Sequence, residues 1–437
     1  MTPFDVMGAL REAMTRLRSA GTEPWPGYDP GTVPVAIHDG TATFLFGHPA
    51  PPAEFQPGAP GTPATSQPGL PPVCTFAGLH PAVRANSVAL VGDQLTATVM
   101  LTPEFTSVAA TAAIVAHEAF HVYQYQHHPG WGADESQALT YPVTSAPLHH
   151  LLLMEMEALE QALSAGGAPD RGALWVRLAL DLRHRRHALL PPGATVFEQS
   201  IERLEGLAHY VEMHFVAASA DGAPSHRTLR FGPDDVRRRS YAVGQALALL
   251  LDRFDHTWKA RLTQHDTLFL DDMLDQALPL HLQPATIAEA AVAALQARAE
   301  GEVEEVARKR EALRASVVTR GGWRLEVIAA PADPLRPKGF DPMNLHPLGP
   351  AEVLHTRWLR LGNDANTIEV FGEVVTAGAG AHPLFTGIAR MTALGLTAAP
   401  QITHDADTVT VTGQGIEATF RHAAVTQTGQ TVTITLA

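Results

Sequence analysis

The sequence has very little cysteine and no long apolar run. Its one cysteine, Cys74, cannot form an intrachain disulfide, which is typical of a protein from a reducing compartment. No stretch approaches the ~18 consecutive apolar residues of a membrane-spanning helix. Residues 3–19 mix apolar and charged side chains, which predicts an amphipathic helix and not a signal peptide. We therefore expect a soluble, cytoplasmic protein that has no membrane partner.

Positive charge is also scarce. The chain has 31 Lys and Arg against 45 Asp and Glu, a formal net charge of -14 at pH 7. This balance argues against a nucleic-acid partner, because no extended Lys/Arg cluster offsets it locally. A short basic stretch at residues 183–187 is predicted to be a solvated helix face or a helix end. Five scattered histidines in the last hundred residues are also expected at the surface: His346, His355, His382, His404 and His422.

The most informative stretch is His117-Glu118-Ala119-Phe120-His121, within a predicted helix over 107–128. Residues four apart share a helix face, so two imidazoles can bind one metal ion there. The upstream flank is small and apolar all round, which suits a buried helix. Buried His and Glu side chains need compensation, and metal ligation supplies it. The spacing predicts one Zn²⁺ per chain held by His117 and His121, with Glu118 as the general base.

A catalytic zinc usually takes a third protein ligand and keeps one position open. His127 is too close in the same predicted helix to fold back on the metal. The third ligand should therefore be a carboxylate from a later helix. The alternatives for it include Glu155, Glu202 and Asp134, and Glu155 could instead orient a ring nitrogen of His117 or His121.

The segment Leu204-Glu205-Gly206-Leu207-Ala208-His209-Tyr210 resembles the Asn-Glu-Gly-Phe-Ala type helix of gluzincins. Gluzincins are the thermolysin- and aminopeptidase-like zinc peptidases, and the chain as a whole resembles a little-characterised bacterial group of them. The resemblance implies a zincin-like fold and Glu205 as the third zinc ligand. Gly206 and Ala208 are small, so we expect this helix to approach the motif helix closely. Glu205 lies 84 residues after His121 (205 − 121), farther than is usual in gluzincins, and Leu204 replaces their Asn.

An oxyanion formed during hydrolysis needs a second electrophile. His209 follows Glu205 by about one helical turn and shares its face. Tyr241 stands in Ser240-Tyr241-Ala242-Val243-Gly244, where the resemblance implies a tyrosine, and Tyr210 is a further candidate. We take His209 and Tyr241 as the catalytic partners of Glu118.

The pattern of apolar residues predicts an α+β protein with two domains. Residues 1–320 form a mainly helical zincin-like domain with a small N-terminal sheet, and residues 321–437 form a sandwich-like all-β domain. The Pro-rich segment 331–350 is predicted to be a linker or long loop. Within the first domain, hairpins are predicted around Asp39-Gly40 and Gly92-Asp93, and strand 95–101 is expected at a sheet edge. Later helices are predicted over 147–164, 169–190, 195–218, 234–254, 267–278 and 285–318. Strands of the second domain are predicted over 353–361, 367–376, 408–412, 416–421 and 431–436.

The chain is thus predicted to be a zinc-dependent hydrolase, in particular a peptidase acting on peptide or protein substrates. A zinc hydrolase of a non-peptide substrate and an inactive zinc-bearing scaffold that binds a partner through the β domain are the alternatives. The intact Glu118 argues against the scaffold, because an inactive descendant would have no reason to keep the base. The sequence predicts neither the oligomeric state nor the precise substrate.

Overall fold

The computed structural model describes residues 25–58, 72–101, 107–165, 169–219, 228–341, 344–380 and 382–437, with Gly8 and Thr15. Most of the helix predicted over 3–19 lies outside these residues. The chain divides into two compact units, Met1–Glu300 and Gly301–Ala437, and the predicted α+β class is confirmed. The division falls within the long helix α10 (Glu289–Val318), just before the predicted limit at 320–321.

The N-terminal sheet has the strand order β3-β4-β2-β1-β6-β5. Its strands are β1 (Val35–His38), β2 (Ala42–Phe46), β3 (Gln56–Pro57), β4 (Val73–Ala77), β5 (Ser87–Val91) and β6 (Gln94–Met100). Both predicted hairpins are present, and Gly40 and Gly92 take the positive φ that their turns require. The edge prediction for 95–101 is wrong: β6 lies between β1, to which it is parallel, and β5, which forms the edge.

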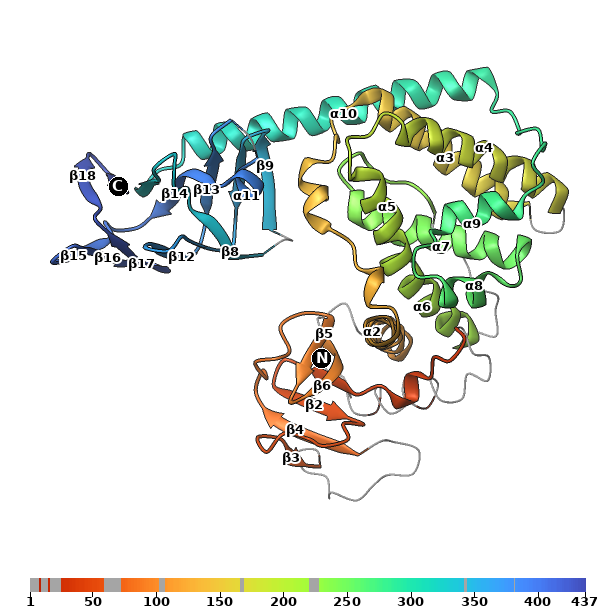
Figure 1. Cartoon of the computed structure of the whole chain (residues 1–437), viewed down its shortest axis with the longest axis horizontal. Coiled ribbons are helices and arrows are strands. Elements are labelled where there is room, and N and C mark those ends of the chain that lie inside the picture. Colours follow the sequence, from red (N-terminus) through yellow and green to blue (C-terminus); the bar gives the residue numbers. More distant parts are fainter. Residues whose placement is uncertain are drawn as a thin grey trace. The chain divides into compact units, whose positions relative to one another are not determined.

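Helix α2 (Val108–His127) lies between this sheet and the later helices (Figure 1). These are α3 (Ala146–Ser164), α4 (Pro169–His187), α5 (Ala194–Ile201), α6 (Leu207–Ser219), α7 (Val236–Phe254), α8 (Trp258–Gln264) and α9 (Leu270–Ala277). Burial on both sides explains why the sequence of α2 is apolar all round: Phe120 packs edge-on to Trp25 and Tyr28, at centroid distances of 5.6 and 5.1 Å. Within the described residues no helix is long and apolar enough to cross a membrane.

The C-terminal unit is all-β and has two sheets around one apolar core. The first sheet has the order β18-β19-β7-β14-β13-β10-β9 and the second β15-β16-β17-β12-β11-β8. The strands are β7 (Trp323–Ile328), β8 (Arg336–Phe340), β9 (Leu345–Gly349), β10 (Glu352–His355), β11 (Trp358–Gly362), β12 (Thr367–Phe371), β13 (Val374–Gly378), β14 (Ile388–Leu396), β15 (Gln401–Asp405), β16 (Thr408–Gly413), β17 (Ile416–Arg421), β18 (Ala424–Thr428) and β19 (Thr431–Thr435); a short helix, α11 (Pro383–Thr386), precedes β14.

Three predictions for this unit are wrong. The segments 353–361 and 367–376 are not single strands, because each turns midway and continues in the opposite sheet. The supposed linker at 331–350 contains β8 and β9. His355, the last residue of β10, and His382, the N-cap of α11, are buried, at 0% and 8% exposure.

Candidate metal centre

The side chains of the His-Glu-x-x-His motif on helix α2 are buried. The Ser107 hydroxyl caps the helix by accepting a hydrogen bond from the Ala110 N–H. His117, Glu118 and His121 are buried, at 4%, 5% and 7% exposure. The imidazole rings of His117 and His121 lie 4.8 Å apart, as expected for one helix face. The structure therefore brings the two predicted ligands together away from water.

Glu205 arrives at the same point from a distorted part of its helix. The predicted helix 195–218 is observed as α5 and α6 joined by a π-helical turn, Glu202–Gly206. Such turns are rare and concentrate at functional sites. Gly206 lies against Gly244 of α7, where an added Cβ would be 2.5 Å from the Gly244 Cα. Its small size thus serves the approach to α7, and not to the motif helix as predicted.

Three donor atoms form a compact triangle. The Nε2 atoms of His117 and His121 lie 3.1 Å apart, and Oε2 of Glu205 is 3.5 and 3.2 Å from them. Ligands of tetrahedral zinc, at ~2.0–2.1 Å from the metal, are separated by about 3.3–3.4 Å. The observed edges match this spacing. The donor set, two imidazoles and one carboxylate, is also one that zinc prefers.

Each of the three donors is oriented by a further side chain. Nδ1 of His117 lies 3.2 Å from Oε2 of Glu212, and a carboxylate only accepts, so the ring proton is on Nδ1. Nδ1 of His121 lies 2.7 Å from Oε1 of Gln124, whose amide Nε2 donates to the Leu204 carbonyl at 3.0 Å. With Nδ1 carrying the proton, each neutral ring keeps its lone pair on Nε2, which suits metal ligation.

The remaining oxygen of Glu205 is held by Arg237. The guanidinium Nη2 donates to Oε1 of Glu205 at 2.8 Å, while its Nε donates to Oε2 of Glu135 at 3.0 Å. Oε2 of Glu205 is therefore the oxygen directed at the two imidazoles. Two unprotonated ring nitrogens and a carboxylate oxygen around one point repel one another, and a cation relieves this repulsion.

The electrostatics of the residues themselves favour a positive charge here. Burial disfavours the imidazolium of His117, yet hydrogen bonds to Glu205 and Glu212 outweigh it and raise its pKa to about 10. Despite burial, hydrogen bonds to the histidines keep the pKa of Glu205 well below its usual range and that of Glu212 at about 2. The same carboxylates that stabilise an imidazolium would stabilise a metal cation.

Glu118 differs from its acidic neighbours. Burial raises the pKa of its carboxyl group above the ordinary value, although His117 and His121 lower it in part. A carboxylate with a raised pKa is a better proton acceptor. Glu118 thus has the environment of a general base.

The two predicted electrophiles lie beside the donors. Nδ1 of His209 is 2.8 Å from Oε2 of Glu212, the oxygen that His117 also approaches, and its buried Nε2 has no partner within the described part of the chain. The ring of Tyr241 stacks on His117 at 5.7 Å with an interplanar angle of 8°. Burial and the carboxylate of Glu205 raise the pKa of Tyr241, so its phenol stays protonated.

His117, His209 and Glu212 form a second group whose donor atoms lie within 4.8 Å of one another. Hydrogen bonding explains this group, because both rings can donate to the one Glu212 oxygen. In the first triangle the three atoms are all acceptors when both rings are neutral, so a proton on an Nε2 or a bound cation must satisfy them.

The rival ligands lie elsewhere. Glu155 and Glu202 pair with Arg183, and Glu155 also binds Arg186, in a buried ionic cluster. Glu155 is therefore neither a ligand nor a partner of His117 or His121. Asp134 caps a short 3₁₀ helix through the Ser136 N–H, and Nδ1 of His127 donates to the carbonyl of Tyr123 in its own helix.

Residues 183–187 do form the end of α4, but the ionic cluster corrects their interpretation as a solvated face. Arg183 and Arg186 are each 1% exposed, because their guanidinium groups face inward onto buried acids. The cluster includes Arg183, Arg186, Arg239, Glu155, Glu198, Glu202, Asp271 and Tyr141. Because Glu202 begins the π turn, the cluster supports the segment that carries Glu205.

Sequence reasoning missed three residues of the site: Gln124, Glu212 and Arg237. Two of them had a detectable pattern. Gln124 lies one turn after His121, and Glu212 lies two turns after Glu205, on the same helix face. Arg237 had none, since its contact with Glu205 depends on how α7 crosses the π turn. Comparison of the chain with protein-family models, curated proteins and solved structures finds no match.

Proposed function

We propose that this chain is a zinc-dependent hydrolase of gluzincin-like type and that it cleaves peptide bonds. One observation carries the proposal: the Nε2 atoms of His117 and His121 and Oε2 of Glu205 face one another at the spacing of tetrahedral zinc ligands. The adjoining Glu118, with its raised pKa, supports hydrolysis in particular. The likeness of residues 204–210 to the gluzincin helix favours a peptide bond as the substrate.

In the proposed mechanism His117, His121 and Glu205 hold the metal. When bound, zinc lowers the pKa of a water molecule and polarises the carbonyl to be attacked. Glu118 accepts the proton of the attacking water and delivers it to the leaving amine. The Tyr241 phenol donates a hydrogen bond to the oxyanion. The His209 ring, whose Nδ1–H is held by Glu212, donates a second from Nε2 when it is an imidazolium, and this Nε2 has no partner among the described residues.

The first experiment is the zinc content of the purified protein, by elemental mass spectrometry, for the natural chain and for Glu205→Ala and Glu118→Gln. The proposal expects about one zinc per chain, lost in Glu205→Ala and retained in Glu118→Gln. Glu157→Gln, on α3 and bonded to Gln161, is the matched control and should retain the metal. Two zinc ions per chain would instead assign a metal to the His117, His209 and Glu212 group.

Cleavage of a peptide library then tests the reaction. The natural chain should cleave peptides in a chelator-sensitive way, and Glu118→Gln should bind zinc but not turn over substrate. Turnover by Glu118→Gln would show that Glu118 is not the base. Full zinc binding without cleavage of any peptide would leave a hydrolase of another substrate or a metal-bearing scaffold.

A further inference from the structure

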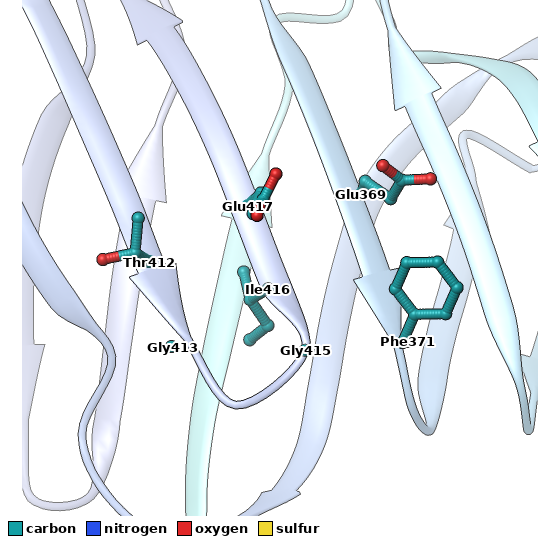
Figure 2. Close-up of a pocket in the computed structure, with 7 residues that line it drawn as sticks. All are labelled: Glu369, Phe371, Thr412, Gly413, Gly415, Ile416 and Glu417. Atoms are coloured by element: carbon teal, nitrogen blue, oxygen red, sulfur yellow. The ribbon is translucent and has the colours of Figure 1, made fainter.

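The outer face of the second sheet of the C-terminal unit is hollowed by a small groove. It lies where β12 meets the hairpin between β16 and β17, and its volume is about 270 Å³. Figure 2 shows the residues that line it, which are Glu369, Phe371, Thr412, Gly413, Gly415, Ile416 and Glu417. Pockets for drug-sized ligands begin at about 300 Å³, so this groove suits one side chain and not a cofactor.

Hydrogen-bond acceptors dominate the groove. Glu369 and Glu417 are direct cross-strand partners on β12 and β17, so their carboxylates project from the same face, as Figure 2 shows. Like charges directly opposite one another destabilise a sheet. Within the described residues Glu417 forms no hydrogen bond or ion pair, and Glu369 accepts only from Nε1 of Trp358, at 2.8 Å. The pair is thus an uncompensated negative charge.

One cation lies nearby without neutralising this charge. Arg360 of β11 is the cross-strand neighbour of Glu369 on its other side. It is exposed, does not line the groove and forms no ion pair within the part of the chain that the structure describes. The lining itself contains no positive side chain, so Arg360 is the cation with which a bound positive group would share Glu369.

An aromatic ring forms one wall. Phe371 is 62% exposed, unusually for a large apolar side chain, and Figure 2 shows its ring beside Glu369. It stacks on Trp358 with ring centroids 6.3 Å apart and planes inclined by 30°. At the end of the groove, Gly415 has φ +66°, and an added Cβ would be 2.5 Å from the Phe371 carbonyl oxygen. Glycine there lets the hairpin between β16 and β17 pack closely against β12.

We propose that this groove binds a basic side chain, lysine or arginine, of a partner polypeptide. The two carboxylates accept hydrogen bonds from the cationic group, and Phe371 covers it by a cation–π contact. The aromatic wall favours an organic cation over a metal ion, whose hard charge prefers oxygen ligands on all sides. The site is independent of the metal centre and gives the β domain a recognition role.

Saturation-transfer NMR on the full chain tests the proposal with three pentapeptides, Ac-Gly-Gly-X-Gly-Gly-amide, in which X is lysine, arginine or norleucine. Norleucine keeps the apolar stem of lysine and removes the charge. The lysine and arginine peptides should receive saturation at millimolar concentration and the norleucine peptide should not. Glu369→Gln with Glu417→Gln should weaken binding by about tenfold or more, and Phe371→Leu by about two- to fivefold.

The control is Asp364→Asn with Asp407→Asn, which removes the same charge from exposed turns of the same unit and should leave binding unchanged. Glu417→Gln should also leave the melting temperature unchanged or raise it, because it removes a repulsion. Equal binding by the norleucine peptide, or equal loss in both double variants, would overturn the proposal. Displacement of the peptides by equimolar Ca²⁺ would do the same, since it would mark a metal site.

Discussion

Replacing Gly206 with alanine tests whether the contact between the π turn and α7 builds the metal centre. The new Cβ would lie 2.5 Å from Cα and 2.9 Å from C of Gly244, and 3.2 Å from the Ser240 carbonyl oxygen. All three are backbone atoms, so no side chain can rotate aside. Because carbon atoms pack at about 3.5–4.0 Å, the two segments must separate by roughly 1 Å.

The expected magnitude follows from two opposing terms. Overpacking of this kind costs about 1–3 kcal/mol, and an overlap against backbone belongs at the upper end. Alanine regains at most about 1 kcal/mol over glycine through helix propensity. We therefore expect the free energy of unfolding to fall by about 2 kcal/mol. Glu205 precedes Gly206, while Arg237 and Tyr241 are on α7, so the shift should also weaken zinc binding at least about tenfold.

Urea denaturation gives the stability, and competition with a chromophoric chelator gives the zinc affinity. Gly301→Ala is the matched control, because Gly301 lies within α10 and has no atom within 4 Å of an added Cβ. This control should be stabilised by up to about 1 kcal/mol and keep its zinc affinity. If Gly206→Ala behaved like Gly301→Ala, the close packing of the π turn on α7 would be refuted.

Two further predictions concern buried charge. Arg183→Met leaves Glu155, Glu202 and Asp271 without their shared partner and should lower the free energy of unfolding by about 3–5 kcal/mol. In the same urea titration, the control Arg185→Met, at an exposed position, should change it by about 0.5 kcal/mol or less. Burial, with nearby His382, lowers the pKa of His355 from 6.5 to about 4. The neutral ring therefore contributes to the free energy of unfolding in full above pH 6.5, and this contribution falls by about 3 kcal/mol towards pH 4. Hydrogen exchange of β10 and β13 amides should show this acid loss in the natural chain and a smaller one in His355→Gln; an identical loss in both would contradict the assignment.

Local patterns determined much of this protein. The helix around His117 and His121 and the shared face of the two rings follow from a spacing of four residues, which depends only on helix geometry. The two N-terminal hairpins follow from Asp39-Gly40 and Gly92-Asp93, because few other pairs suit such turns. Each of these features depends on a few neighbouring residues, so tertiary packing has little influence on it.

The identity of the third metal ligand depended on tertiary structure. Glu155, Glu202 and Glu205 were all candidates in the sequence, where a resemblance favoured Glu205. Packing separates them: two face buried arginines, while the π turn directs Glu205 to the histidines. The basic stretch at 183–187 was misjudged for the same reason, since a charge pattern along one helix does not reveal the acids that other helices bring to it. The sequence by itself determined which residues can bind a metal or carry a charge, and the tertiary structure decided which of them meet, because those contacts join segments dozens of residues apart.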